Sequence, residues 1–264
     1  MLKWFETTGR KYLKLFAHIE GPELEPTMFH SHYLSARATA ATRQTLQSLL
    51  YGDVLDVGAG TGYGKRLLPD NANYFPTDID GARDYRDKSL TRNGVALAKH
   101  CSVYHIDYLD NRFDGCLALS LFEHLEQPDK AIAEIRRVVK DNGLIVLMVP
   151  FSFPIHGYPA DYWRWTVEGL KRFLGGHGAQ VIDCFACGKS IHSIALNLNL
   201  FLREGMILEG HKPSTPRLFF YVIIRPFLTL LFFLINALAL MLGAFDKSTT
   251  LPILICAVGR NIKH

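Results

Sequence analysis

The sequence predicts an α/β fold in which a mostly parallel sheet carries helices on both faces. From residue 53 onward, short apolar segments typical of buried strands alternate with segments of helical periodicity. The first apolar segment, 53–57, leads directly into a loop with glycine at every second position, 58–64. A chain of 264 residues that is 48% hydrophobic can form one large core with an insertion.

Seven segments are expected to form the strands. Each is short and apolar and is bounded by residues that favour turns. They are 53–57, 73–77, 101–105, 115–120, 143–150, 179–186 and 252–259.

Helices are expected where apolar residues recur every three or four positions. Residues 128–140 have the pattern of an amphipathic helix, which should end at Asn142 and Gly143. Thr166 is a typical N-cap for a helix that runs through Phe173. Residues 1–50 are expected to form an N-terminal helical cap, because 35–50 is rich in strong helix formers.

The glycine loop has the features of a cradle for a nucleotide-like ligand. Glycine tolerates positive φ and leaves no Cβ in the path of a ligand, and a helix is expected to open at 63–68. The second apolar segment ends in Asp78, where an acid can accept hydrogen bonds from ribose hydroxyls. The alternative is an ordinary glycine turn with a surface aspartate.

The spacing of the glycines separates two kinds of cradle. A dinucleotide fingerprint requires a glycine where this chain has Tyr63, whereas its third glycine is Gly62. The pattern D-x-G-x-G-x-G at 56–62 instead resembles motif I of the class I S-adenosylmethionine (SAM)-dependent methyltransferases. The resemblance covers about residues 50–188 and the final strand. It implies a doubly wound, Rossmann-like sheet of seven strands, with the last strand antiparallel beside the fifth and sixth.

The same resemblance implies SAM as the cofactor. Asp107 follows the expected third strand, where the family often has an acid near the adenine amino group. The residues expected to bind the cofactor are Asp56, Gly58, Ala59, Gly60, Thr61, Gly62, Asp78, Ile79, Asp107 and Ser120.

Methyl transfer sets requirements for the catalytic residues. The attacking atom, the methyl carbon and the sulfonium sulfur must be held nearly in line, and a hydroxyl acceptor must also lose a proton. His124 follows the fourth strand and His156 the fifth, so either is expected to act as the base. Glu123 and Asp161 are further candidates. A structural role for each histidine, such as capping a helix, is the alternative.

The segment 154–166 (PIHGYPADYWRWT) is expected to meet the acceptor. It resembles a subgroup often found with polysaccharide or lipid-linked glycan biosynthesis. Tyr162 and Arg164 are expected to bind a sugar face and an acidic group, and a rigid aromatic brace is the alternative. No metal is expected, because Ser120 stands where the metal-dependent catechol-type enzymes have an aspartate.

Charge and cysteine content narrow the partners and the compartment. The net charge of +4 is too small to indicate nucleic-acid binding. The five cysteines are odd in number and lie mostly in apolar segments, which is typical of reduced thiols in a cytosolic protein.

Residues 190–250 are expected to form an apolar helical insertion before the last strand. No charged residue occurs in 226–245, which is long enough to cross a bilayer. Because a core strand follows, the chain must return, so we expect peripheral or re-entrant contact with the cytoplasmic face of a membrane. A homodimer interface and a buried helix are the alternatives. The basic and aromatic segment 1–16 is interpreted as a membrane-surface helix or a helix covering the domain edge.

These features predict a SAM-binding domain of residues 51–189 and 251–264, flanked by the cap 1–50 and the insertion 190–250. The expected function is transfer of a methyl group to an oxygen or nitrogen of a small-molecule or lipid-linked acceptor, such as a glycan. The alternatives are a non-catalytic SAM-binding membrane protein and a nicotinamide oxidoreductase.

Overall fold

The computed structural model describes residues 19, 26–60, 62–79, 95–157, 160–204 and 215–263. They belong to two compact units. The sheet unit contains the described residues of 39–151, 155–187 and 254–264, and the helical unit contains those of 1–38, 152–154 and 188–253. The segment 1–16, discussed above as a surface helix, lies outside the described residues.

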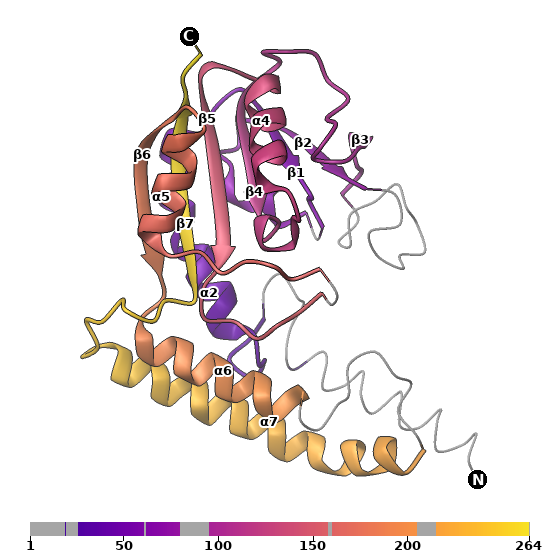
Figure 1. The fold of residues 1–264 in the computed structure, drawn as a ribbon. Coiled ribbons are helices and arrows are strands. Elements are labelled where there is room, and N and C mark those ends of the chain that lie inside the picture. Colours follow the sequence, from indigo (N-terminus) through magenta and orange to yellow (C-terminus); the bar gives the residue numbers. More distant parts are fainter. Residues whose placement is uncertain are drawn as a thin grey trace. The chain divides into compact units, whose positions relative to one another are not determined.

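A seven-stranded sheet organises the sheet unit, with the strand order β3-β2-β1-β4-β5-β7-β6 (Figure 1). Every neighbouring pair is parallel except those of β7, which runs antiparallel to both β5 and β6. The strands are β1 Asp53–Val57, β2 Asn73–Asp78, β3 Lys99–His100, β4 Phe113–Leu119, β5 Val139–Pro150, β6 Ala179–Cys187 and β7 Leu254–Asn261. The expected fold class is therefore confirmed, including the position and direction of the last strand.

The helices also follow the sequence pattern closely. The helices are α2 Tyr33–Ala41, α3 Arg43–Leu49, α4 Pro128–Val138, α5 Val167–Gly176, α6 Ser190–Glu204 and α7 Thr215–Gly243, and the 3₁₀ helices are η1 Tyr63–Leu67 and η2 Phe122–His124. As predicted, Thr166 caps α5, because its hydroxyl accepts a hydrogen bond from the Gly169 amide at 3.0 Å.

One local prediction was wrong, and two expected helical segments are present but are not single regular α-helices. The third strand is only Lys99–His100, and 101–105 forms a turn in which the His105 amide donates to the Ser102 carbonyl at 3.0 Å. Residues 35–50 are helical, as expected, and form two helices that are separated at Thr42, whose hydroxyl donates to the Thr39 carbonyl at 2.8 Å. The glycine loop is followed by a five-residue 3₁₀ helix instead of an α-helix.

Asn142 and Gly143 have a different role from the one expected. Helix α4 ends earlier, at Val138, and β5 has already begun at Val139. The register against β4 then shifts, and Asn142 adopts a φ of 62° within β5. The two residues therefore form an irregularity inside the strand, in which Asn142 tolerates the positive φ and Gly143 leaves no Cβ where one would lie 2.7 Å from Val139 Cγ1.

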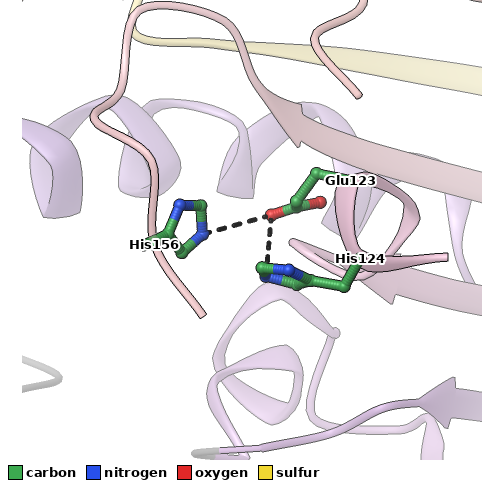
Figure 2. Close-up of side chains that lie close together, drawn as sticks. All are labelled: Glu123, His124 and His156. Carbon is green, nitrogen blue, oxygen red and sulfur yellow. Dashed lines mark ion pairs between the residues drawn. The ribbon is translucent and has the colours of Figure 1, made fainter. Parts of the chain in front are cut away.

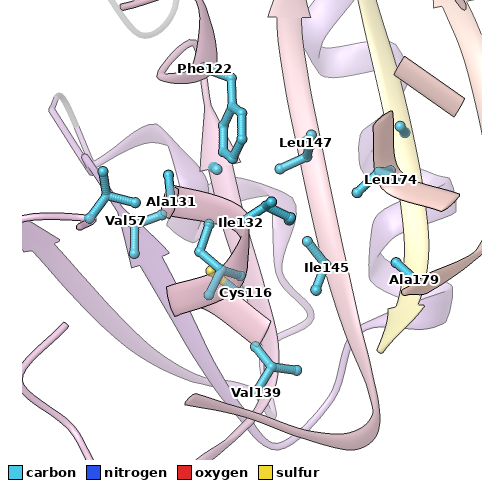
Figure 3. Close-up of a cluster of buried hydrophobic side chains, with 14 of the residues drawn as sticks. Val57, Cys116, Phe122, Ala131, Ile132, Val139, Ile145, Leu147, Leu174 and Ala179 are labelled. Carbon is cyan, nitrogen blue, oxygen red and sulfur yellow. The ribbon is translucent and has the colours of Figure 1, made fainter. Parts of the chain in front are cut away.

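The core lies between the sheet and helices α4 and α5 (Figure 3). Ala131, Ile132 and Ile135 form the apolar face of α4 and are fully buried. They pack in one cluster with residues of β4 and β5, including Cys116 and Ile145. Burying each large aliphatic side chain contributes about 1.5–3 kcal/mol, so this layer holds the strand ends in fixed positions.

One buried side chain joins the end of α4 to β5 and β7. Asn261 on β7 is fully buried, and its Nδ2 donates to the carbonyls of Arg136 and Val139, both at 3.0 Å, and of Lys140 at 3.2 Å. Its Oδ1 accepts a hydrogen bond from Arg136 Nε at 2.9 Å. Carbonyls at a helix end have no partner within the helix, so Asn261 supplies one.

The helical unit is built on α6 and α7, which lie side by side (Figure 1). The start of α6 and the end of α7 are tied together, since the Ser190 amide donates to the Ser248 carbonyl at 3.1 Å and the Ile191 amide to Asp246 Oδ2 at 2.9 Å. Asn199 Nδ2 donates to Asn236 Oδ1 at 2.9 Å in the C-terminal half of α7. Among the described helices, only 223–243 of α7 has the length and composition of a membrane span, a test that a core helix also passes.

We predict that Asn261→Ala lowers the free energy of unfolding by about 2–4 kcal/mol, because buried carbonyls lose their donor. Urea denaturation followed by circular dichroism measures this change. Gln180→Ala, an exposed change on the neighbouring strand β6, serves as the control and should leave the stability almost unchanged. Equal stabilities of the two variants would contradict the role given to Asn261.

Candidate active site at the carboxyl edge of the sheet

The glycine loop after β1 has the backbone conformation that its sequence predicts. Gly58, Gly60 and Gly62 have φ values of 67°, 50° and 74°, which favour glycine. The loop is held to β2 by the Ala59 amide, which donates to the Thr77 carbonyl at 2.9 Å. A Cβ built on Gly60 would meet only the Gly58 carbonyl, at 3.7 Å, so this point of the loop is open to a ligand. Thr61 lies outside the described residues.

Asp78 lies beside this loop, as expected. One carboxylate oxygen accepts a hydrogen bond from the Gly60 amide at 3.0 Å, and the other from the Ile79 amide at 2.8 Å. Ile79 follows with half of its side chain exposed. The glycine loop and the acid, which are far apart in the sequence, therefore form one continuous surface.

Asp56 lies beneath the loop instead of on its open side. It is 1% exposed, and the Tyr74 hydroxyl donates to its Oδ2 at 2.6 Å. A Cβ on Gly64 would come within 2.2 Å of that oxygen, so the carboxylate fills the space that this glycine leaves. Burial raises the pKa of Asp56 to about 7, opposed by the Tyr74 hydrogen bond and assisted by the charge of Asp78.

The other two predicted cofactor residues have different surroundings. The Asp107 carboxylate is exposed and accepts a hydrogen bond from Lys99 Nζ at 2.7 Å, a contact that lowers its pKa. Its described contacts are therefore to Lys99 and not to the glycine loop. Ser120 directly follows β4, has a φ of 49° and is exposed. The next residue, Leu121, packs against the loop, because a Cβ on Gly58 would lie 2.9 Å from its Cδ1.

Three side chains beyond the ends of β4 and β5 come together, and we call Glu123, His124 and His156 the Glu–His–His cluster (Figure 2). Glu123 is fully buried, and neither of its carboxylate oxygens has a hydrogen-bond partner in the described chain. Its Oε1 lies 3.7 Å from Nε2 of His124 and 3.7 Å from Nε2 of His156. The sequence placed both histidines at this edge but gave Glu123 only a secondary role.

The opposite nitrogen of each ring faces an acceptor. His124 Nδ1 lies 2.5 Å from the Ala160 carbonyl, which can only accept, so Nδ1 carries the proton. His156 Nδ1 lies 3.4 Å from Asp161 Oδ2. Arg164 binds both oxygens of Asp161 and holds its pKa at about 2, so this carboxylate is ionised. Each imidazole is therefore oriented with Nε2 toward Glu123.

The segment after β5 encloses this cluster. The Tyr162 amide donates to the Glu123 carbonyl at 2.7 Å, and Trp163 Nε1 donates to the Leu125 carbonyl at 2.7 Å. Gly157, with a φ of 65°, packs directly on the His124 ring. Half of the Tyr162 side chain is exposed, so it can meet an acceptor. The charge of Arg164 is paired with Asp161, and Asp161 Oδ2 in turn lies 3.4 Å from His156 Nδ1.

Comparison with known proteins agrees with this arrangement. Residues 55–147, from β1 to β5, match a family described as "Methyltransferase domain". A solved SAM-dependent methyltransferase from Archaeoglobus fulgidus has the same fold, with a TM-score of 0.50 and 15% identity over 86% of this chain and 94% of that one. A chain of a complex that contains the Haloferax volcanii Trm112 methyltransferase activator gives a TM-score of 0.52 at 14% identity, over 88% and 94% of the two chains.

Two curated relatives are similar over this part of the chain. The ubiquinone/menaquinone biosynthesis C-methyltransferase UbiE of Cupriavidus pinatubonensis is 32% identical over 36% of this chain and 42% of its own length. The malonyl-[acyl-carrier protein] O-methyltransferase of Geobacter sulfurreducens is 33% identical over 49% and 51%. The chain thus spans about half the length, or less, of these relatives. The family match over residues 55–147, the glycine motif and the strand order identify this part of the chain as a methyltransferase domain of the class I SAM-dependent type.

We predict that Asp56→Asn removes a pH dependence from the stability of the protein. Because the folded pKa of Asp56 is about 7, well above that of an unfolded aspartate, the folded protein binds this proton more tightly. The free energy of unfolding of the wild type should therefore fall, relative to the variant, by on the order of 4 kcal/mol from about pH 4 to about pH 7. Urea unfolding at a series of pH values tests this, and parallel curves for the two proteins would contradict it.

Proposed function

We propose that this protein transfers the methyl group of SAM to an oxygen or nitrogen of a small or lipid-linked acceptor. The observation that carries the proposal is the Gly60–Asp78 contact, which joins a glycine loop and an acid at the carboxyl edge of the sheet. This is the arrangement expected for a ligand with an adenosine-type ribose. The family match over 55–147 covers both residues.

The reaction assigns a task to the Glu–His–His cluster. The acceptor oxygen forms a bond to the methyl carbon while the carbon–sulfur bond breaks, and the sulfonium sulfur keeps the electron pair as a neutral thioether. The acceptor hydroxyl must release its proton, and an imidazole Nε2 without a hydrogen can accept it. His124 and His156 both present Nε2 at this edge, oriented by Ala160 and Asp161.

The class of acceptor is proposed from two observations. The relatives named above act, by their names, in quinone biosynthesis and on malonyl-[acyl-carrier protein]. Proteins that contain a similar domain therefore include enzymes of quinone biosynthesis and enzymes with carrier-linked acceptors. In this chain, exposed Tyr162 lies beside the Glu–His–His cluster and offers an aromatic face. A glycan or another lipid-linked acceptor fits such a face. A non-catalytic SAM-binding protein is the alternative, and an activity assay separates the two.

Calorimetry with SAM, its demethylated product and NAD tests the cofactor. We predict that Asp78→Ala weakens SAM binding by about 1–3 kcal/mol, because ligand hydroxyls lose their acceptor. Gly60→Ala should weaken it too, by filling the open face of the loop. Gly175→Ala is the control, since a Cβ there meets nothing within 4 Å and lies on α5, away from the loop. Tighter binding of NAD than of SAM would favour an oxidoreductase.

We further propose that α6 and α7 hold the protein to the cytoplasmic face of a membrane without crossing it. The exposed apolar residues of α7 recur at helical spacing over its described length and include Ile223, Phe227, Leu230, Leu234, Leu238 and Met241. The opposite face carries buried Asn236, which donates to the Met28 carbonyl at 2.8 Å. A helix with polar contacts on one side and an apolar stripe on the other is suited to lying in the interface.

The length and ends of the helices support the same proposal. Helix α6 has 15 residues, which is too short to cross a bilayer. The start of α6 is bonded to the segment after α7, so the chain leaves and returns at one place. In this proposal the expected insertion, 190–250, is the membrane-contacting part and 51–189 with 251–264 binds SAM.

We predict that Leu230→Gln, Leu234→Gln and Leu238→Gln combined lower binding to lipid vesicles by more than about tenfold, because apolar area is lost from the interface. Vesicle co-sedimentation measures this. Leu109→Gln, at an exposed apolar residue of the sheet unit, is the control. A wild-type protein that ignores vesicles but forms a dimer, and becomes a monomer in the triple variant, would assign this face to self-association.

A further inference from the structure

The Glu–His–His cluster poses an electrostatic problem that its described contacts do not solve. The Glu123 carboxylate is fully buried, yet neither oxygen has a hydrogen-bond partner in the described chain. Leaving a buried carboxylate without compensation is costly, and such groups are normally paired with a cation or bound to a metal. The nearest described partners, the two imidazole Nε2 atoms, lie 3.7 Å away, which is beyond hydrogen-bond distance.

We propose that Glu123, His124 and His156 bind one divalent transition-metal ion. One donor atom from each residue lies within 4.8 Å of the others. Metal bonds of about 2.1 Å place neighbouring ligand atoms about 3.4 Å apart in a tetrahedral site. The two Glu–His separations of 3.7 Å therefore need to contract by a few tenths of an ångström, and the separation of the two histidines, which is at most 4.8 Å, by up to about 1.4 Å.

The surroundings of the two rings match those of metal-bound histidines. A histidine ligand usually donates its other N–H to a carbonyl or carboxylate, which fixes the tautomer and orients the ring. His124 Nδ1 faces the Ala160 carbonyl, and His156 Nδ1 faces the ionised Asp161. Both Nε2 lone pairs are thereby directed at the position beside Glu123 Oε1.

The donor set indicates the kind of metal and its use. Two imidazoles and one carboxylate suit Zn²⁺, Mn²⁺, Co²⁺ or Fe²⁺, and three protein ligands leave a coordination position open. This use of the metal rests on the proposed function. An acceptor hydroxyl would take the open position, where the metal would lower the pKa of the hydroxyl, so that the hydroxyl proton passes to solvent before methyl transfer. The histidines would then be ligands instead of free bases. This proposal replaces the expectation of no metal, which considered only Ser120.

Metal binding is tested on the full-length protein without a histidine tag and without SAM, after stripping with a chelator. Zn²⁺ is titrated by calorimetry, and Co²⁺ is followed by its visible absorption. We predict one ion per chain, with an affinity that falls by about tenfold or more in Glu123→Gln, His124→Ala and His156→Ala. His177→Ala is the matched control, because His177 faces a carbonyl through Nδ1 and the Asp129 carboxylate through Nε2, with no third donor in the described chain.

The outcomes separate this proposal from the methyltransferase proposal. Unchanged affinity in all three ligand variants, or no binding of one ion per chain, would overturn the metal site. If circular dichroism shows that Glu123→Gln does not fold, the variants at His124 and His156, which are partly exposed, still test the metal site. SAM calorimetry on the same samples reports the cofactor site independently, so metal binding without SAM binding would leave the metal site standing and sink the methyltransferase proposal.

Discussion

The pairing of β7 between β5 and β6 is the constraint on which the rest of the architecture depends. β7 is antiparallel to both neighbours and shares a long register with each. Because β6 and β7 are neighbours in the sheet, the chain segment between them leaves the sheet after Cys187 and returns to it at Leu254. The apolar helices α6 and α7 occupy this interval, and the hydrogen bonds between Ser190 and Ser248 close it at its base. The position of β7 in the sheet therefore requires the segment that contains α7 to return to the sheet.

The parallel strands determine the site in a similar way. Since β1, β2, β4 and β5 run in the same direction, the loops that follow them emerge at one edge. This brings the glycine loop to Asp78 and places Leu121 against Gly58. Described residues of the segment after β5 then contact the cluster, since the Tyr162 amide donates to the Glu123 carbonyl and His124 Nδ1 donates to the Ala160 carbonyl. The glycine loop and the Glu–His–His cluster are therefore positioned by the same core.

Two buried carboxylates give this edge its electrostatic character. Asp56 lies beneath the glycine loop with a hydroxyl partner and a raised pKa, so its protonated form is favoured at low pH. Glu123 lies beside two imidazoles that are oriented toward it but stay beyond hydrogen-bond distance. The position of Asp56 is explained by its packing beneath the glycine loop, next to Gly64. The arrangement of Glu123 with the two imidazoles has the geometry of a cation-binding site.

From the sequence alone it was possible to predict the α/β class, six of the seven strands within a few residues, the glycine loop beside Asp78, and the position of both histidines. These are local properties, because periodicity, glycine spacing and strand ends are read along one stretch of chain. Only the tertiary structure decided that Asp107 pairs with Lys99, that Asp56 is buried, and that Glu123 is the centre of the cluster. The physical reason is that burial and side-chain pairing depend on which distant segments pack together, and residue order does not contain that information.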